Sequence, residues 1–258
     1  MTGGQFSIDG STAIVTGASS GIGKAIAEQF AADGLDVVIC SREQENVDPV
    51  AEAINESERA GRALGVECDV TDRDAVDALV ETTVEEFGGL DVLVNNAGAS
   101  FMANFDGISP NGWNKIVDIN LTGTYHCTQA AGEYLKDGGG SVINLSSEAG
   151  QDGAPYMSHY AAAKAGVITL TTTLANEWAA DGVRVNCIAP GYVATPGVES
   201  QMGVTADDID RDDVDRTIGR SDEIADIAQF LASPAASYVV GETIRAAGVP
   251  DLMKTPDQ

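Results

Sequence analysis

The stretch Thr12–Lys24, TAIVTGASSGIGK, places a short run of β-branched and apolar residues directly before a glycine-rich turn. The run Thr12–Thr16 predicts a strand, and the apolar spacing from Gly21 to Ala32 predicts a helix. Glycines at a strand-to-helix turn let the backbone approach a phosphate group closely, and the amino terminus of the helix offers unpaired N–H groups. The stretch therefore predicts an α/β fold that begins with a phosphate-binding turn.

Short β-rich runs alternate with helical patterns along the rest of the chain. Strands are predicted at Thr12–Thr16, Asp36–Cys40, Leu64–Cys68, Asp91–Asn95, Ser141–Ser146, Arg184–Ala189 and Glu242–Ala246. Helices are predicted at Gly21–Ala32, Pro49–Gly61, Arg73–Phe87, Asn111–Leu135, Tyr160–Ala180 and Asp222–Leu231. The strand runs do not alternate apolar with polar residues, which is typical of strands covered on both faces. The pattern predicts a Rossmann-type, doubly wound parallel sheet of about seven strands with helices on both faces.

No stretch of the 258-residue chain has the composition of a linker, so we expect a single domain over residues 1–258. The segment 196–219 contains TADDIDRDDVDR and is predicted to hold no strand. Because it is long for a connection and follows a strand end, we interpret it as a lid over a substrate. A solvated acidic surface helix is the alternative interpretation. Residues 249–258 are expected to form a C-terminal tail.

The charge of the chain is strongly negative. Forty acidic and 14 basic residues give a formal net charge of −26. Such a charge argues against nucleic acid or an anionic membrane as a partner. An acidic, lysine-poor surface suits concentrated salt, because salt screens the repulsion. We therefore expect a halophilic source, and an acidic mesophilic protein with bound counterions is the alternative.

The four cysteines (Cys40, Cys68, Cys127 and Cys187) show no C-x-x-C pair and no metal-ligand spacing. We expect buried free thiols in a reducing compartment and no metal site. The amino terminus lacks the basic region and hydrophobic core of a secretory signal, and no apolar stretch approaches membrane-spanning length. A cytoplasmic location is expected.

Three residues near the middle of the chain have the types and spacing of a proton-transfer site. Ser147 follows a predicted strand, Tyr160 stands thirteen residues later, and Lys164 follows four residues after that. Residues i and i+4 share one face of a helix, so the phenol and the ammonium are expected to be neighbours. The cation is then expected to lower the tyrosine pKa from its usual value near ~10, which favours proton exchange near neutral pH.

The T-G-x-x-x-G-x-G spacing at Thr16–Gly23 resembles that of the short-chain dehydrogenase/reductase family. Asp69-Val70, Asn95-Asn96-Ala97-Gly98 and Pro190-Gly191 match further elements of that family in the same order. The resemblance extends from about Ile8 to Gly248. It implies an enzyme that transfers a hydride between a nicotinamide cofactor and a carbonyl or alcohol substrate.

The resemblance also implies a role for each site residue. Tyr160 would be the general acid/base, Ser147 would bind the substrate oxygen, and Lys164 would support Tyr160 and hold the nicotinamide ribose. Asn120 would hold a water of the proton relay. The implied cofactor-binding residues are Gly17, Ser19, Ser20, Gly21, Ile22, Gly23, Ser41, Arg42, Asp69, Val70, Asn96, Ala97, Gly98, Tyr160, Lys164, Pro190, Gly191, Val193 and Thr195.

The end of the second strand favours NADP(H) over NAD(H). An acidic residue there would bind the ribose hydroxyls of NAD, whereas this chain reads Ser41-Arg42. The planar guanidinium of Arg42 suits a 2′-phosphate, which it can bind through two charge-assisted hydrogen bonds. NAD(H) is the alternative, with Arg42 as a solvated turn residue. Ser20 also differs from the basic residue that some NADP-dependent members of the family carry at that position.

Several other residues resemble site residues without the matching context. Tyr156 has no lysine four residues on and is expected to line the rim of the substrate site, and Ser146 is expected to face away from it. His126 and His159 lack companion metal ligands. Trp113 and Trp178 lie in helical patterns and are interpreted as packing residues.

The expected substrate is a small neutral ketone, alcohol or sugar. The residues that would border it are mixed apolar and polar (Ser100, Phe101, Glu148, Gly150, Tyr156, Tyr192 and the segment 196–219), and the negative net charge disfavours strongly anionic compounds. A 3-oxoacyl-thioester reductase, acting on acyl carrier protein or CoA thioesters, is the alternative. An NADP-binding redox sensor is the alternative of another class, although Ser147, Tyr160 and Lys164 are all present.

The end of the last strand departs from the family pattern. Members commonly finish it with Asp-Gly-Gly, whereas this chain reads Arg245-Ala246-Ala247-Gly248. The family forms dimers or tetramers, so we expect a homo-oligomer, and the departure affects expectations for subunit contacts and substrate preference.

Overall fold

The computed structural model describes residues 6–8, 10–57 and 59–250. The strands are β1 (Thr12–Thr16), β2 (Asp36–Ser41), β3 (Ala63–Glu67), β4 (Val92–Asn95), β5 (Gly140–Leu145), β6 (Val183–Pro190), β7 (Tyr192–Ala194), β8 (Ile218–Arg220) and β9 (Thr243–Ala246). The helices are α1 (Gly21–Ala32), α2 (Gln44–Asn55), α3 (Arg73–Phe87), α4 (Pro110–Val117), α5 (Gly123–Lys136), α6 (Glu148–Asp152), α7 (Ser158–Trp178), α8 (Pro196–Met202) and α9 (Ser221–Ala232). None of these helices combines the length and apolar character that a bilayer-spanning helix needs.

Seven strands form one parallel sheet in the order β3-β2-β1-β4-β5-β6-β9, which confirms the predicted fold class. The chain builds outward from β1 through β2 to β3, then returns to place β4 on the other side of β1. Strand order therefore reverses between β1 and β4. In open α/β sheets a ligand binds outside the carboxyl ends of the strands at such a point.

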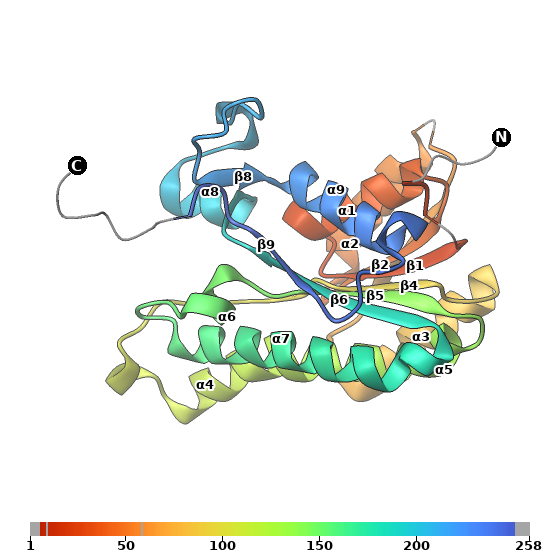
Figure 1. Cartoon of the computed structure of the whole chain (residues 1–258), viewed down its shortest axis with the longest axis horizontal. Coiled ribbons are helices and arrows are strands. Elements are labelled where there is room, and N and C mark those ends of the chain that lie inside the picture. The colour runs from red at the N-terminus through yellow and green to blue at the C-terminus, as the bar shows by residue number, and fades with distance from the viewer. Residues whose placement is uncertain (1–5, 9, 58, 251–258) are drawn as a thin grey trace.

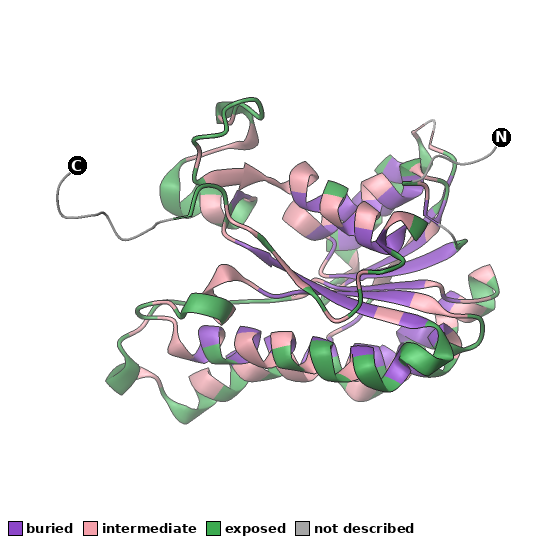
Figure 2. Ribbon diagram, in the orientation of Figure 1, coloured by how far each residue is buried: buried purple, intermediate pink, exposed green. Residues whose placement is uncertain are grey.

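Helices cover both faces of the sheet (Figure 1). One apolar core joins the sheet to α1, α2 and α9, and a second core joins its other face to α3, α5 and α7. The inner strands β2, β1, β4, β5 and β6 are mostly buried (purple in Figure 2), whereas the edge strands β3 and β9 are partly exposed. Burial on both faces explains why the strands read as continuous apolar runs.

Two helices differ from the sequence-based prediction. Helix α2 begins at Gln44 and ends at Asn55, so the predicted range of Pro49–Gly61 was wrong at both ends. Proline favours the first turn of a helix, whereas Pro49 lies inside α2. The predicted helix Asn111–Leu135 is α4 and α5 separated by a π-turn at Asp118–Thr122.

The segment 196–219 was wrongly predicted to contain no strand. It begins with α8, where Pro196 occupies the first turn and the Thr195 hydroxyl accepts a hydrogen bond from the backbone N–H of Val198. It ends in β8, which pairs in parallel with β7 in a separate two-stranded sheet. A three-residue strand held by distant backbone partners leaves no periodicity for sequence analysis to detect. Of the predicted C-terminal tail, residues 251–258 lie outside the described residues.

A buried polar network links the two central strands to the helices below them. The Asn95 amide donates to the Thr128 hydroxyl (2.8 Å) and to Oδ1 of Asn144 (2.8 Å). The Asn144 amide in turn donates to the Thr171 hydroxyl (2.9 Å). These four side chains are at most 3% exposed. Buried polar groups of this kind are costly when their partners are removed.

We therefore expect Asn144→Ala to destabilise the protein by about 2–4 kcal/mol, because it opens a cavity and removes one buried hydrogen bond each from Asn95 and Thr171, which keep their bonds to Thr128 and to the Val167 carbonyl. Urea unfolding followed by circular dichroism measures the loss. Asn114→Ala, an exposed position on α4, is the control and should change the free energy of unfolding by less than about 0.5 kcal/mol. Equal stability of the two variants would contradict the role of the network.

Candidate active site

The turn after β1 and the turn after β4 lie in direct contact at the point where strand order reverses. The Asn96 amide donates to the backbone carbonyls of Thr16 and Gly17, at 2.9 Å each. The Thr16 hydroxyl accepts the backbone N–H groups of Asn96 and Ala97, at 3.0 Å each. These bonds fix the two turns against each other at the carboxyl edge of the sheet.

Two glycines permit this close approach. Gly17 has φ +64°, and a Cβ on it would lie 2.7 Å from Cα of Ala97. A Cβ on Gly23 would lie 2.4 Å from the Asn96 amide nitrogen. Gly23 therefore serves the packing of α1 against Asn96, while Gly17 shapes the turn itself.

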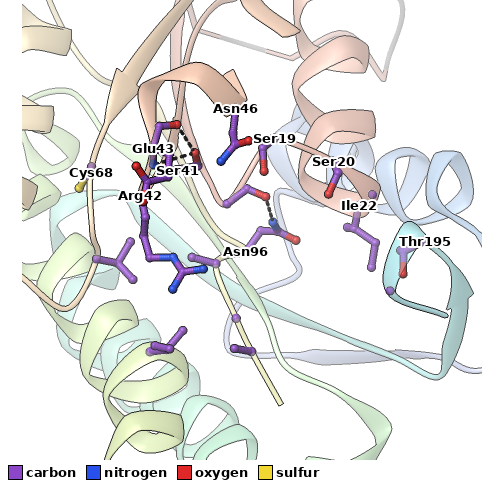
Figure 3. Close-up of a pocket in the computed structure, with 18 of the residues that line it drawn as sticks. Ser19, Ser20, Ile22, Ser41, Arg42, Glu43, Asn46, Cys68, Asn96 and Thr195 are labelled. Carbon is purple, nitrogen blue, oxygen red and sulfur yellow. Dashed lines mark hydrogen bonds between the residues drawn. The ribbon is translucent and has the colours of Figure 1, made fainter. Parts of the chain in front are cut away.

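A cavity of about 390 Å³ opens above the two turns (Figure 3). The predicted residues that line it are Gly17, Ser19, Ser20, Gly21, Ile22, Ser41, Arg42, Asp69, Val70, Asn96, Ala97, Gly98 and Thr195. Sequence analysis missed Glu43, Asn46, Cys68, Ala99, Ile119, Pro196 and Gly197. The predicted Gly23, Tyr160, Lys164, Pro190, Gly191 and Val193 do not line this cavity.

The amino terminus of α1 faces the cavity with features that suit a phosphate group. Ser20 is the residue before the helix, and its side chain makes no capping hydrogen bond. The first turn of α1 carries no acidic residue. Backbone N–H groups and the positive end of the helix dipole are thus available at the glycine turn.

Glu43 and Asn46 were missed because α2 begins earlier than predicted. Glu43 directly precedes α2 and Asn46 lies in its first turn, so both reach the cavity. Gln44 fixes this turn by donating to the Gly65 carbonyl (2.9 Å) and accepting from the Glu67 backbone N–H (2.7 Å). The acidic residue directly after Arg42 was the available sequence signal.

Ser41 and Arg42 differ in how they meet the cavity. The Ser41 hydroxyl donates to the Glu43 carbonyl at 2.8 Å, so it is engaged within the turn. The Arg42 guanidinium extends into the cavity (Figure 3), and it makes no ion pair with the described residues. An exposed guanidinium at this place can accept an anionic ligand group.

Ser147 and Tyr160 lie together beyond the carboxyl end of β5. Ser147 directly precedes α6, where its hydroxyl accepts the backbone N–H of Ala149 (3.2 Å). Tyr160 is in the first turn of α7. A side-chain hydrogen bond with Ser147 lowers the pKa of Tyr160, but burial raises it more, so the pKa is above its ordinary value.

Lys164 is buried one turn further along α7. Its ammonium donates to the Leu145 carbonyl at 2.7 Å and lies 5.7 Å from the centre of the Tyr160 ring. Burial lowers the pKa of Lys164 to about 8. The predicted juxtaposition of Tyr160 and Lys164 is present, but the predicted lowering of the Tyr160 pKa is wrong in this structure, because burial penalises both charged forms.

Asn120 lies in the π-turn between α4 and α5 and is fully buried. Its amide donates to the carbonyls of Ala99 (2.7 Å) and Ile116 (2.8 Å), while Oδ1 has no partner among the described residues. A Cβ on Gly98 would lie 2.8 Å from this Oδ1 and 3.5 Å from Nζ of Lys164. The space left by the absent side chain of Gly98 is therefore close both to Oδ1 of Asn120 and to the ammonium of Lys164. π-turns occur frequently at functional sites.

The remaining predicted residues lie outside the cavity, some in the interior and some at the surface. Gly191 follows β6 and donates its backbone N–H to the Ala246 carbonyl (3.0 Å), whereas Val193 is buried in a core. Ser146 is buried and its hydroxyl donates to the Lys164 carbonyl (2.8 Å), so it is directed away from Ser147 and Tyr160. Tyr156 is exposed, with φ +65°.

The burial of Lys164 leads to a prediction about stability. Its folded pKa of about 8 lies below the ordinary lysine pKa of 10.5, so the unfolded chain binds this proton more strongly and the lysine destabilises the fold below about pH 8. We expect Lys164→Met to raise the free energy of unfolding at pH 7 by about 1–2 kcal/mol, since part of the gain is offset by the lost bond to Leu145. The gain should shrink as pH rises from 8 towards 10.

Urea unfolding at pH 7 and pH 9.5 measures this difference. Lys115→Met, at an exposed position on α4, is the control and should show no comparable gain at pH 7. A Lys164→Met variant that is less stable than the parent at pH 7 would contradict the proposal that the buried charge of Lys164 lowers the free energy of unfolding.

Known proteins are similar to this chain in sequence and in fold. Residues 11–203 match the family described as short chain dehydrogenase. A 3-oxoacyl-[acyl-carrier-protein] reductase from Synechocystis sp. is 40% identical, covering 92% of this chain and 95% of its own length. A cis-4-hydroxycyclohexanecarboxylate dehydrogenase from Sinomonas cyclohexanicum is 43% identical, with coverage of 92% and 94%. The crystal structure of a short-chain type dehydrogenase/reductase from Mycobacterium marinum is 33% identical, superposes with a TM-score of 0.85, and is matched over 95% of this chain and 96% of its own. The chain belongs to the short-chain dehydrogenase/reductase family of NAD(P)-dependent enzymes, which act on carbonyl and alcohol groups.

Proposed function

We propose that this enzyme uses NADP(H) to interconvert a small neutral carbonyl compound and its alcohol. The proposal is carried by the grouping of three side chains: Ser147 lies close enough to Tyr160 to lower the pKa of its phenol, and the buried ammonium of Lys164 lies 5.7 Å from the centre of the phenol ring. Two hydroxyls at one point can bind one substrate oxygen, and a buried cation can stabilise a phenolate.

The cavity offers groups that suit the phosphate and adenine part of a dinucleotide. The α1 amino terminus and the glycine turn would hold the pyrophosphate, and Asp69 and Val70, which line the cavity, would contact the adenine. Arg42 and Ser41 would meet the 2′-phosphate. Lys164 would bind the nicotinamide ribose, with Pro190, Gly191, Val193 and Thr195 bordering the nicotinamide. When bound, the reduced cofactor supplies the hydride that the carbonyl carbon accepts.

The side chains of the site would supply the proton that the substrate oxygen takes up. In the reductive direction Tyr160 donates its phenolic proton to the substrate oxygen, while the Ser147 hydroxyl donates a hydrogen bond to it. Lys164 stabilises the phenolate that remains. The unpaired Oδ1 of Asn120 is directed to the gap beside Nζ of Lys164, where it can hold a water that returns a proton to the site.

The preference for NADP(H) rests on Arg42. A carboxylate at the end of β2 would repel a 2′-phosphate, and position 41 carries serine instead. Glu43 also lines the cavity and opposes an anion. The backbone carbonyl of Glu43 accepts the Ser41 hydroxyl, whereas the Arg42 guanidinium itself extends into the cavity. We therefore expect the attraction between Arg42 and a 2′-phosphate to outweigh the repulsion from Glu43.

Exposed aromatic side chains support an uncharged substrate. Phe101 and Tyr156 are exposed in loops, and Tyr192 is exposed at the start of β7. α8, which starts directly after the cavity residue Thr195, would act with the rest of segment 196–219 as a lid. Such a rim suits apolar or ring-shaped carbonyl compounds.

A 3-oxoacyl-thioester reductase is the second candidate. It is supported by the name of the relative from Synechocystis sp.. The net charge of −26 disfavours it, because a CoA thioester carries several negative charges. A panel of cyclohexanone, ethyl acetoacetate and acetoacetyl-CoA, each with NADPH, separates the two candidates. A kcat/KM for acetoacetyl-CoA well above those of the other two, at both low and high salt, would favour the second candidate.

Arg42→Ala tests the cofactor assignment. We expect the Kd for NADPH to rise by about 10- to 100-fold, because charge-assisted hydrogen bonds to the 2′-phosphate contribute roughly 1.5–3 kcal/mol. The Kd for NADH should change by less than about threefold. Fluorescence titration measures both. Arg62→Ala, which removes a guanidinium paired with Asp36 elsewhere, controls for net charge. Equal NADPH affinity in both variants would overturn the assignment.

Tyr160→Phe tests the proton donor. We expect kcat/KM to fall by about 10²–10⁴-fold, because the aromatic ring remains but the transferable proton is lost. NADPH should bind with nearly unchanged affinity. Tyr125→Phe, at an exposed site on α5, is the matched control for loss of a phenol. If Tyr160→Phe retains most of its activity on the same panel, another group must protonate the substrate.

A further inference from the structure

Arg245 makes two ion pairs beside the candidate active site. Its guanidinium pairs with Glu148 and, through Nη1, with Oδ2 of Asp152 at 2.8 Å. Glu148 is the first residue of α6 and Asp152 is the last. One arginine therefore holds both ends of this short helix.

Helix α6 depends on tertiary contacts for its position. It has five residues, none of them buried, and so it has no apolar anchor of its own. A helix this short is unstable in isolation. One side of α6 rests on α7, where a Cβ on Gly150 would lie 2.8 Å from the Lys164 carbonyl carbon. The Arg245 ion pairs supply a second attachment through the Glu148 and Asp152 side chains.

The strand that carries Arg245 is itself fixed. β9 pairs with β6, with Arg245 opposite Ala189, and the next residue accepts the Gly191 backbone N–H at 3.0 Å. A Cβ on Gly191 would lie 3.2 Å from Oε2 of Glu148. The carboxylate of Glu148 thus lies between the end of β6 and Arg245, and its side chain stays partly exposed.

We propose that Arg245 is a positioning residue for Ser147, which directly precedes α6 and whose hydroxyl already accepts a bond from that helix. By holding Glu148 and Asp152, Arg245 fixes the distance between Ser147 and Tyr160. It also pairs the carboxylate next to Ser147, so that Glu148 does not stand as an uncompensated negative charge where the substrate oxygen becomes negative. The inference rests on the proposed function of Ser147.

The central test compares Arg245→Gln with Arg62→Gln, which removes the same charge from an ion pair with Asp36. Hydrogen–deuterium exchange without cofactor should show faster exchange over residues 149–157 in Arg245→Gln alone. With NADPH and ethyl acetoacetate, kcat should fall by about tenfold, because small misplacement of a reacting group is costly. The Kd for NADPH should stay within about twofold, and thermal stability should change little, since Arg245 is partly exposed.

Two further variants test the ion pairs themselves. Arg245→Lys should retain a kcat between those of the parent and Arg245→Gln, because one ammonium cannot bind two carboxylates as the planar guanidinium does. Asp152→Asn should lower kcat less than Arg245→Gln. The double variant should be no slower than Arg245→Gln, because the Asp152 contact is already lost. Additive losses would overturn the assignment of the pair.

The other outcomes are also decisive. Exchange and kcat that match those of Arg62→Gln would overturn the positioning role. A Kd for NADPH that rises as much as kcat falls would show a general structural role instead. A folded parent protein that binds neither NADPH nor NADH and reduces no compound of the panel would instead contradict the proposed function, a failure that is visible without any Arg245 variant.

Discussion

The structure depends on the close contact between the turns after β1 and β4. The parallel sheet brings these turns to one edge, and the Asn96 amide joins them through two carbonyls. The side-chain-free surfaces of Gly17 and Gly23 are required because any Cβ there would lie within 2.7 Å of the neighbouring turn or of Asn96. The cavity, the free amino terminus of α1 and the start of α8 near Gly21 all follow from this contact.

A second constraint is the burial of Lys164. The ammonium is held within the protein by the Leu145 carbonyl, and its pKa falls to about 8 because charge is costly in a low-dielectric interior. The same burial keeps the ammonium out of solvent at 5.7 Å from the centre of the Tyr160 ring. The protein thus carries a destabilising buried charge at the candidate site, as functional sites commonly do.

Sequence analysis predicted the features that depend on local patterns. The sheet, the glycine turn and the juxtaposition of Tyr160 with Lys164 follow from periodicity and from i, i+4 spacing. It failed where distant contacts decide. β8 forms only because β7 lies beside it, and Glu43 and Asn46 reach the cavity because Gln44 binds β3 and starts α2 early. The pKa direction of Tyr160 was missed because burial cannot be read from neighbours in sequence.

Arg245 shows the same limit most clearly. Its partner Glu148 is 97 residues away in the chain, and sequence comparison marked this end of the strand only as a departure from the family pattern. In the structure, Arg245 at this departure from the family pattern forms ion pairs with Glu148 and Asp152 of α6, the helix that follows Ser147. A strand end that differs from the family pattern can therefore still support the candidate site through contacts with a neighbouring helix.

The strong negative charge of the chain must still allow an anionic cofactor to bind. Charges separated by more than about 8 Å are largely screened at physiological ionic strength, so the groups at the cavity decide. There the chain presents the uncapped start of α1 without an acidic residue in its first turn, and the guanidinium of Arg42. Further from the cavity, three acidic residues of α9 (Asp222, Glu223 and Asp226) are paired with Arg211, Arg216 and Arg220. The net charge thus governs solubility and long-range repulsion, while the affinity for a phosphate is set by a few oriented dipoles and one cation.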